Sequence, residues 1–452
     1  RFLMPHQRLA RRRPDAPRVL AFRVLRSVTG QDAYANLELG RQLAEARPDA
    51  RDAAFVTELV SGTCRLLGTY DRVLETASGR PTPALQPELL DTLRLGTHQL
   101  LSMRVPARAA VAATVELAGA EVGERVVGLT NAVLRKVAAR SLDEWVAELS
   151  VGEDAVGALA TRTHHPRWIA EVYLDLLGDE AEAALTADNV APVTTLAIRP
   201  GLATRAELDG EPTPYSPFGA RRAGNPADLP ALREGRAGVQ DEGSQLVAWA
   251  LAHPEAPADP WLDLCAGPGG KAALLAGLAI EAGERLVASE LQEHRAVLVA
   301  QALRAYSGTH APVVLCADGT RPAWRPGLFA RVMADVPCTG LGALRRRPEA
   351  RWRRTPADLD ALVPLQRVLL TNALEAAAPG GVVAYATCSP HRRETVDVVD
   401  AVLATTPRTV QRLHTSDALP GVPDCALGDA VQLWPHRHGT DAMFLALLRV
   451  TA

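Results

Sequence analysis

The spacing of hydrophobic residues changes along the chain, and its first part has the period of α-helices. Apolar side chains there recur every three or four positions, as they do on one face of an amphipathic helix. Leu89, Leu93, Leu100 and Met103 follow this spacing within one such stretch. Proline-containing breaks separate the stretches, because proline cannot continue a helical hydrogen-bond ladder. The pattern predicts an all-α domain over residues 14–145.

From about residue 236 onward, short strand-like runs alternate with helical stretches. The runs are short and largely apolar; they read WLDL, RLVAS, PVVLC, FARVMA, VVAYAT and AMFLALLR. Such alternation is typical of a parallel sheet wrapped by crossover helices. Ligands of these sheets bind at the carboxyl ends of the strands. We therefore expect an α/β domain over residues 236–452.

Two further segments complete the predicted organisation. Residues 1–13 hold a basic cluster, Arg8, Arg11, Arg12 and Arg13, and end before a proline, which indicates a flexible basic arm. Residues 146–235 form a connecting region of mixed α/β character, with one strand-like run, TTLAIRP, and a stretch rich in proline, glycine and arginine. The adjacent His164 and His165 of this region precede a proline, so we expect them on a loop surface rather than at a metal.

Composition narrows the class of protein. The 452 residues are 47% hydrophobic and 22% charged, with a formal net charge of −3, so nucleic-acid binding would have to come from local basic patches. The six cysteines show no close pairing, which predicts free thiols and no metal site. The N-terminal residues lack the apolar stretch of a signal peptide. We expect a cytoplasmic protein, monomeric and without membrane contact.

A glycine-rich turn, DLCAGPGGK, follows the first predicted strand and leads into a helix. Glycines at such a turn let a ligand approach the backbone. The spacing matches neither the dinucleotide motif nor the P-loop. Glu290, Asp318 and Asp335 each follow or end one of the next three strands. Because parallel strands end at the same edge of a sheet, these three carboxylates should face one pocket.

Two cysteines lie in loops after later strands, Cys338 in ADVPCTG and Cys388 in YATCSPH. Cysteines at such positions are candidates for covalent catalysis, in which a thiolate attacks the substrate and is later released. One thiol can attack and the other can assist release, and the residues alone leave open which does which.

The helical part resembles a known RNA-binding fold. The segments FVTELVSGTCRLLGTYD, LRLGTHQLL and NAVLRKV occur in the order found in the NusB antitermination factor. This resemblance implies that the all-α domain binds RNA or ribonucleoprotein. Core packing alone explains most of its leucines.

The C-terminal part resembles class I S-adenosylmethionine-dependent methyltransferases, which have a Rossmann-like, mainly parallel seven-stranded sheet. The two cysteine motifs and DLCAGPGGK are similar to those of the RNA 5-methylcytosine branch, and the NusB-like region narrows the resemblance to bacterial 16S ribosomal RNA cytosine-C5 methyltransferases. By this resemblance Glu290 binds the ribose, where aspartate is common, Asp318 lies near the adenine, and Asp335 lies between cofactor and base. The residues implied around S-adenosylmethionine are Cys265, Ala266, Gly267, Pro268, Gly269, Gly270 and Lys271.

The same resemblance assigns attack to Cys388 and release to Cys338, on an unpaired or flipped cytosine of ribosomal RNA. Arg392 and Arg393 lie near Cys388 in sequence and are candidates to favour its thiolate. Two alternatives stay open: the same reaction on transfer RNA, and a catalytically idle RNA-binding or ribosome assembly factor.

An arginine-rich run follows the Cys338 loop. Arginines pair with phosphates, and an aromatic ring stacks on an unpaired base. The position of the run beside the expected site favours RNA contact over a solvated charged face. The residues predicted to bind RNA are Arg345, Arg346, Arg347, Arg351, Trp352, Arg353 and Arg354.

Overall fold

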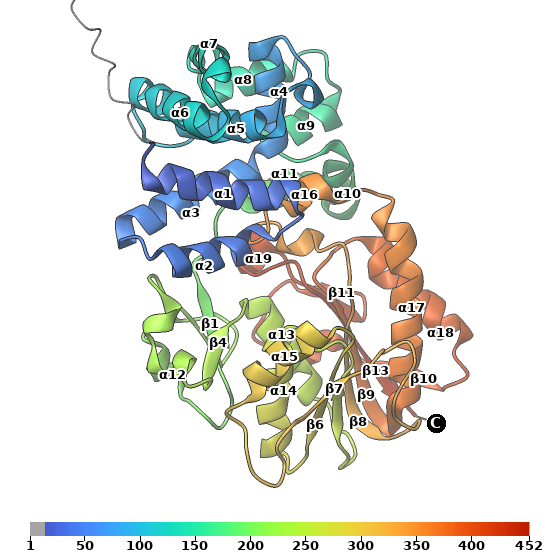
Figure 1. Cartoon of the computed structure of the whole chain (residues 1–452). Helices are drawn as coiled ribbons and strands as arrows, with labels where there is room; N and C mark the ends of the chain where they lie inside the picture. The colour runs from blue at the N-terminus through green and yellow to red at the C-terminus, as the bar shows by residue number, and fades with distance from the viewer. Residues whose placement is uncertain (1–13, 452) are drawn as a thin grey trace, which may run out of the picture. The chain divides into compact units, whose positions relative to one another are not determined.

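The structure is a computed structural model that describes residues 14–451 (Figure 1). The chain divides into two compact units. The first, here called the helical unit, contains residues up to 185 together with residues 346–353, and the second, the catalytic unit, contains the rest. The boundary at 185 falls inside the predicted connecting region. The membership of residues 346–353 in the helical unit was not predicted. The predicted basic arm, residues 1–13, lies outside the described residues.

The helical unit begins with eight α-helices, in agreement with the predicted all-α domain. Their bounds are α1 Ala16–Gly30, α2 Ala35–Ala46, α3 Ala50–Arg65, α4 Leu67–Ser78, α5 Pro87–Leu101, α6 Ala107–Glu121, α7 Val127–Val137 and α8 Leu142–Leu149. Helix α5 is central, because it packs against α1, α3, α4, α6 and α7. Its leucines serve two apolar clusters: Leu95 packs with α1 and α3, and Leu93 packs with α4 and α7.

Local sequence explains where several of these helices begin. Proline occupies the first position of α5, where its missing N–H costs no helical hydrogen bond. Asp49 caps α3 by accepting a hydrogen bond from the backbone N–H of Asp52. Ser141 and Glu144 form a reciprocal capping box at the start of α8.

The helical unit continues beyond the predicted domain. Three more helices follow, α9 Ala155–Thr163, α10 Arg167–Leu177 and α11 Ala181–Ala187, and residues 346–353 add the short helix α16, Ala350–Arg353. His164 and His165 join α9 to α10. The expectation of two surface histidines is wrong for His165, which is buried and bonds through Nδ1 to the carbonyl oxygen of Thr163 at 2.7 Å.

A small antiparallel sheet opens the catalytic unit. Its strands are β1 Thr195–Ile198, β2 Glu211–Pro212, β3 Gly219–Arg221 and β4 Ala237–Val239, in the order β2-β3-β1-β4. Strand β1 is the run TTLAIRP that the sequence singled out, and the next two strands lie in the proline- and glycine-rich stretch. The short helix α12, Pro230–Arg233, precedes β4.

The main sheet of the catalytic unit contains all six predicted strands. Its members are β5 Trp261–Asp263, β6 Leu286–Glu290, β7 Val313–Cys316, β8 Phe329–Asp335, β9 Ala377–Thr387, β10 Val410–Arg412, β11 Ala426–Leu427, β12 Ala430–Gln432 and β13 Phe444–Val450. Strands β7, β6, β5, β8 and β9 lie side by side and parallel, whereas β13 pairs antiparallel with β9. The sheet has nine strands rather than seven, because short antiparallel strands continue it beyond β13.

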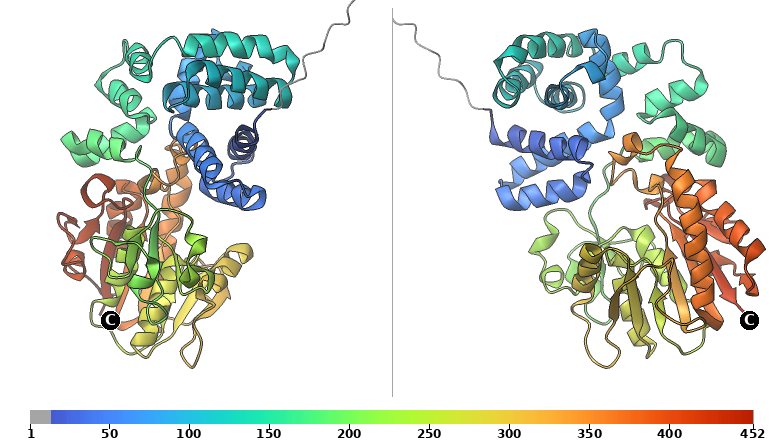
Figure 2. Two further views of the ribbon diagram at one scale, coloured as in Figure 1. Left: turned by 90° about the vertical axis from the view of Figure 1, so that its left-hand side faces the viewer. Right: turned by 45° about the vertical axis from the view of Figure 1, so that its right-hand side comes forward.

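Helices cover both faces of this sheet (Figures 1 and 2). Helices α13 Glu242–Ala252, α14 Gly270–Glu281 and α15 Glu293–Leu303 bury one apolar cluster, and α17 Asp358–Ala376 and α18 Val396–Thr405 bury the other. The short α19, Pro435–His438, precedes β13. This three-layer arrangement is the predicted class I methyltransferase fold. Within residues 14–451 no helix has both the length and the apolar character needed to cross a bilayer.

Candidate active site

The glycine-rich turn runs from the end of β5 to the first turn of α14, as the sequence predicts. Gly269 has φ of +115°, and a Cβ there would lie 2.7 Å from the Cβ of Ala302, so a side chain is excluded both by backbone conformation and by space. At Gly267 a Cβ would collide with the carboxylate of Glu290. The turn therefore presents bare backbone at the carboxyl edge of the sheet, which fits a ligand that approaches closely.

Glu290 ends β6 and turns back onto this loop. Its Oε2 accepts a hydrogen bond from the backbone N–H of Gly267 at 2.9 Å, and its Oε1 accepts one from Gln292 at 3.1 Å. Arg295 stabilises the same turn by donating a hydrogen bond to the carbonyl oxygen of Gly267 at 2.7 Å. A carboxylate has about four acceptor sites, so Glu290 retains capacity for ribose hydroxyls while it holds the turn in place.

Asp318 lies two residues beyond β7. Its Oδ1 accepts hydrogen bonds from the backbone N–H and the hydroxyl of Thr320, at 2.8 and 2.7 Å. These bonds lower the pKa of Asp318, so its carboxylate is charged at neutral pH. The second oxygen, Oδ2, is free of this turn and can accept a hydrogen bond from an exocyclic amine.

Asp335 ends β8 and pairs with Lys271, which stands in the first turn of α14. Lys271 Nζ lies 2.9 Å from Asp335 Oδ2 and 3.0 Å from Ser244 Oγ. Burial lowers the pKa of Lys271, but the charge of Asp335 and their hydrogen bond outweigh burial, so that pKa is raised overall. A cation near a helix N-terminus opposes the helix dipole, and Asp335 offsets that cost.

Asp263, the last residue of β5, was not among the predicted site residues. It is fully buried. Burial and the charge of Asp335 raise its pKa, Lys271 lowers it, and the resulting value is about 8. The sequence signal was present, because Asp263 ends a strand directly before the glycine turn. A buried carboxyl group with a perturbed pKa beside a cofactor turn is a common mark of a functional site.

The two cysteines meet because of strand register. Strands β8 and β9 are parallel neighbours in which Asp335 pairs with Ala386. Cys338 follows that pair by three residues and Cys388 follows it by two. Their Sγ atoms lie 3.4 Å apart, a hydrogen-bond distance between two free thiols. The structure therefore brings together Cys338, Cys388, Asp335 and Lys271 at one edge of the sheet.

The thiol of Cys338 is held in its protonated form. The hydrogen bond with Cys388 raises the pKa of Cys338 well above its ordinary value, and burial raises it further. The interaction with Cys388 also contributes to the raised pKa of Lys271.

Glu394 was also missed, and it holds both cysteine loops. It is completely buried and accepts hydrogen bonds from the backbone N–H of Thr339 at 2.8 Å, from the Thr339 hydroxyl at 2.6 Å and from the Ser389 hydroxyl at 2.6 Å. Thr339 and Ser389 each directly follow one of the two cysteines. No sequence signal marks Glu394, because a single glutamate that follows the basic residues HRR is expected to be exposed on the surface.

Arg392 and Arg393 do not act on the thiolate, contrary to expectation. Arg392 pairs with Asp397 at 3.0 Å and Arg393 pairs with Asp360 at 3.0 Å, and all four side chains are substantially exposed. Both guanidinium groups are thus held at surface carboxylates. Lys271 is a cation that interacts electrostatically with Cys388.

The arginine run also differs from its prediction. Arg345 is buried and pairs with Asp241 at 2.7 Å and Asp441 at 3.2 Å within the catalytic unit. Arg351 is completely buried and donates to the carbonyl oxygen of His164 at 3.1 Å. Direct RNA contact is therefore wrong for these two residues, because their guanidinium groups are enclosed by protein.

The other members of the run have mixed environments. Arg353 donates to backbone carbonyl oxygens at the end of α1 and in the turn after it, including Ala33 at 2.7 Å. Arg347 lies over the ring of Tyr34 at 5.2 Å, and Arg354 lies 3.8 Å from Asp358. Trp352 and Arg346 are half-buried. RNA contact by Arg346, Arg347, Trp352, Arg353 and Arg354 stays a prediction.

Comparison with known proteins identifies the family to which the chain is similar. The profile of a family described as 16S rRNA methyltransferase RsmB/F matches residues 250–449, and that of the NusB family matches residues 15–139. A Mycobacterium tuberculosis protein named "Putative methyltransferase Rv1407" is 50% identical and covers 99% of both chains. The ribosomal RNA small subunit methyltransferase B of Vibrio cholerae is 31% identical over 94% of this chain and 97% of its own.

A solved structure shows the same fold over nearly the whole chain. The crystal structure of PH0851 superposes with a TM-score of 0.79 at 22% identity and covers 96% of this chain and 99% of its own. At this identity the superposition shows the fold, whereas the family profiles and the Vibrio cholerae relative assign the chain to a family. It belongs to the RsmB/F family of S-adenosylmethionine-dependent RNA methyltransferases and carries a NusB domain on its N-terminal side.

Proposed function

We propose that this protein methylates carbon 5 of a cytosine in 16S ribosomal RNA through a covalent bond between Cys388 and the base. The observation that carries this proposal is the 3.4 Å approach of the Cys338 and Cys388 thiols beside the Lys271–Asp335 pair. The reaction at a pyrimidine ring has an attack step and a release step, and two adjacent thiols with one cation can serve both. Such a reaction belongs to the cytoplasm, where ribosomal RNA is made.

S-adenosylmethionine fits the cradle formed by the glycine turn. The collisions of an added Cβ at Gly267 and Gly269 show that these glycines let the turn pack directly against Glu290 and Ala302, which fixes its backbone at the strand ends. Glu290 is placed to bind the ribose hydroxyls and Asp318 to bind the adenine amine. When bound, the cofactor supplies an electrophilic methyl group.

Cys388 acts as the nucleophile in this proposal. Its thiolate is favoured because the proton of the pair stays on Cys338 and because Lys271 faces it. The sulfur bonds to carbon 6 of cytosine, and the electron pair of the 5,6 double bond becomes available at carbon 5 to take the methyl group. Asp335 holds Lys271 and can accept a hydrogen bond from the cytosine amino group.

Cys338 assists release. While Cys388 is a thiolate, its charge and hydrogen bond keep the pKa of Cys338 high. Once the sulfur of Cys388 is bonded to carbon, both effects disappear and the pKa of Cys338 falls. Cys338 first gives its own proton to solvent and then takes the proton from carbon 5. The electron pair of the C5–H bond re-forms the 5,6 double bond, the C6–S bond breaks, and Cys388 leaves as a thiolate.

Ribosomal RNA is the preferred substrate over transfer RNA. The NusB domain implies a large RNA or ribonucleoprotein, and relatives of about 30% identity are named as small-subunit ribosomal RNA enzymes. An idle assembly factor is the other alternative. The retention of both thiols and of the Lys271–Asp335 pair speaks against it, because a scaffold has no use for them.

The test is methylation of defined RNA. Purified protein is incubated with labelled S-adenosylmethionine and either protein-free 16S ribosomal RNA, isolated 30S particles or total transfer RNA, followed by bisulfite sequencing. We expect one protected cytosine in the ribosomal RNA and none in transfer RNA. Label confined to transfer RNA would contradict the substrate, and an absence of 5-methylcytosine in all three would contradict the activity.

A further inference from the structure

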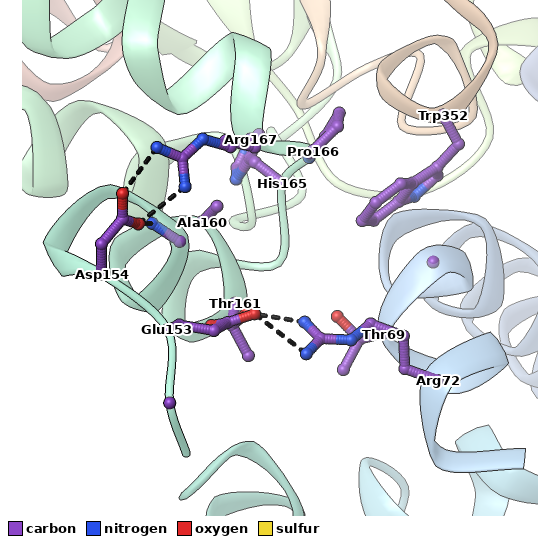
Figure 3. A pocket seen from close by; sticks show the side chains of 13 residues that line it. Thr69, Arg72, Glu153, Asp154, Ala160, Thr161, His165, Pro166, Arg167 and Trp352 are labelled. Atoms are coloured by element: carbon purple, nitrogen blue, oxygen red, sulfur yellow. Dashed lines mark hydrogen bonds and ion pairs between the residues drawn. The ribbon is translucent and has the colours of Figure 1, made fainter. Parts of the chain in front are cut away.

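A cavity of about 570 Å³ lies inside the helical unit, and the reaction does not use it (Figure 3). Its walls come from α4, from the loop that leads into α9, from the junction of α9 and α10, and from α16, the short helix of residues 346–353. Single-ligand sites in proteins have volumes of a few hundred cubic ångströms. The cavity is therefore large enough for one nucleotide.

The charges that line the cavity are paired. Arg72 lies 2.9 Å from Glu153 and donates to the Thr161 hydroxyl at 2.7 Å, and Arg167 makes two bonds to the carboxylate of Asp154 at 2.6 and 2.7 Å (Figure 3). A phosphate would have to displace a carboxylate from either arginine. The lining thus suits an uncharged polar ring better than an anion.

His165 adds no charge to this lining. Burial lowers the pKa of its imidazole well below the ordinary value, and the nearby Arg351 lowers it further. The ring is therefore neutral at physiological pH, and its Nδ1 bonds to the carbonyl oxygen of Thr163.

Trp352 gives the cavity an aromatic wall. Its Nε1 donates to the carbonyl oxygen of Cys64 at 3.0 Å, so the only polar atom of the indole is already bonded to the main chain. A Cβ on Gly68 would collide with the six-membered ring, which means that the indole rests directly on the backbone of α4. Figure 3 shows the indole pointing into the space between Pro166 and Thr69. What the half-buried ring offers a ligand is a surface for stacking.

We propose that this cavity binds one unpaired nucleobase of the RNA substrate, stacked on Trp352, with the polar edge of the base facing the Arg72–Glu153 pair. This inference rests on the proposed function and names a second contact of the same RNA. Stacking on an aromatic side chain is the usual way in which proteins hold unpaired bases. A neutral, mixed polar lining matches the edge of a base, which carries both donors and acceptors.

Chain connectivity favours RNA over a free nucleotide. Trp352 follows Cys338 by fourteen residues, and Arg345, seven residues after Cys338, is fixed in the catalytic unit by two buried carboxylates. A base bound against Trp352 is thus linked through a short, anchored segment to the loop that carries Cys338. Such a link is useful for a substrate that contacts both Trp352 and the loop of Cys338. A free nucleotide is too small to contact both.

The test uses the full-length protein and 16S ribosomal RNA transcribed with 5-bromouridine, which forms photo-crosslinks to stacked aromatic residues. We expect mass spectrometry of the wild-type protein to find a crosslinked peptide that contains Trp352. Trp352→Ala should weaken RNA binding by roughly five- to hundredfold, as loss of one stacked base does. The salt dependence should not change, because no phosphate contact is removed. Trp352→Phe should retain most of the affinity, and Gly68→Ala, which displaces the ring, should lose part of it.

Controls separate this inference from misfolding and from the proposed function. Leu37→Ala changes an exposed apolar residue of the same unit that does not line the cavity, and should bind RNA like the wild type. Affinity for S-adenosylmethionine should stay unchanged in every variant. If Trp352→Ala does not fold, the crosslink in wild type and the affinities of Trp352→Phe and Gly68→Ala decide the question.

Three results would overturn the inference. The first is an unchanged affinity for RNA in a folded Trp352→Ala variant, and the second is crosslinks only at other sites. The third is saturable binding of cytidine 5′-monophosphate or another nucleoside monophosphate that Trp352→Ala abolishes. That third result would make the cavity a free-nucleotide site. Methylation of the same RNA without bromine, at saturating RNA concentration, is measured separately. Methylation without a Trp352 crosslink would leave the proposed function intact and remove only this inference.

Discussion

At the scale of single residues, the catalytic unit concentrates buried charge around one amine. Lys271 faces Asp335 at 2.9 Å and lies near both Asp263 and Cys388. Three potential anions around one cation cannot all be charged in a buried site without a large desolvation cost. The structure resolves this by keeping a proton on Asp263, whose pKa is raised to about 8. Asp335 is then the carboxylate with which Lys271 forms an ion pair.

This arrangement predicts how stability depends on pH. The folded protein holds the Asp263 proton up to about pH 8, whereas the unfolded chain releases it at about pH 4. Between these values the folded state binds more protons, so the stability that Asp263 contributes is complete below about pH 4 and is lost as pH rises toward 8. Asp263→Asn, which imitates the protonated acid, should flatten the decline of unfolding free energy by up to about 1.4 kcal/mol per pH unit.

Thermal and urea denaturation between pH 5 and 8 measures this difference. Asp400→Asn, which changes a surface carboxylate of α18, is the matched control and should keep the wild-type slope. Identical slopes for wild type and Asp263→Asn would mean that Asp263 is ionised in the folded protein, contrary to our account.

At the scale of elements, the loops after β8 and β9 form the site. The alternation of strands and helices predicted that Glu290, Asp318, Asp335 and the two cysteine loops would share one edge, because carboxyl ends of parallel strands meet there. Sequence reasoning could not find Glu394, whose role depends on hydrogen bonds to Thr339 and Ser389 that only the fold creates.

The arginine run illustrates the opposite error. Six arginines and a tryptophan within ten residues have the composition of an RNA-binding surface, yet Arg345 and Arg351 are buried and residues 346–353 are part of the helical unit. Local composition reports charge, but it does not report which carboxylates and carbonyl groups the fold places beside each guanidinium group.

Glu394→Gln tests the link between the two cysteine loops. The amide loses the charge that strengthens the bonds from Thr339 and Ser389, so the thiols should lose their fixed placement. We expect the methylation rate to fall on the order of tenfold to hundredfold, because small misplacements of reacting groups lower reaction rates by such factors. The dissociation constant of S-adenosylmethionine, measured by calorimetry, should not change. Asp397→Asn, a nearby surface change, is the control. An unchanged rate would show that Glu394 does not position the thiols.

At the scale of the whole molecule, the chain enters the helical unit twice. Residues 346–353 leave the catalytic unit after Arg345 and return to it at Arg354. The small sheet of residues 195–239 belongs to the catalytic unit, where β4 pairs with β1 and Gln245 donates to the carbonyl oxygen of Leu196. A catalytic fragment therefore has to begin near residue 186 and not at residue 236, where the sequence placed the domain boundary.

Two fragments test this boundary. Both carry a glycine–serine linker in place of residues 346–353, because those side chains pack in the helical unit, and they begin at residue 186 or at residue 236. We expect the longer fragment to bind S-adenosylmethionine about as tightly as the full chain. The shorter fragment, whose β4 has lost β1, should melt at a lower temperature. Loss of cofactor binding in a folded 186–452 fragment would show that the helical unit contributes to the cofactor site.

The most direct test of the central claim is the trapping of the covalent intermediate. Wild type, Cys338→Ala and Cys388→Ala are each incubated with 16S ribosomal RNA and S-adenosylmethionine labelled in the methyl group, and the products are separated on a denaturing gel. If Cys388 attacks and Cys338 assists release, Cys338→Ala should accumulate a labelled protein–RNA adduct, and Cys388→Ala should form neither adduct nor product. An adduct in Cys388→Ala with none in Cys338→Ala would reverse the two roles. Full activity in both variants would contradict covalent catalysis by this pair.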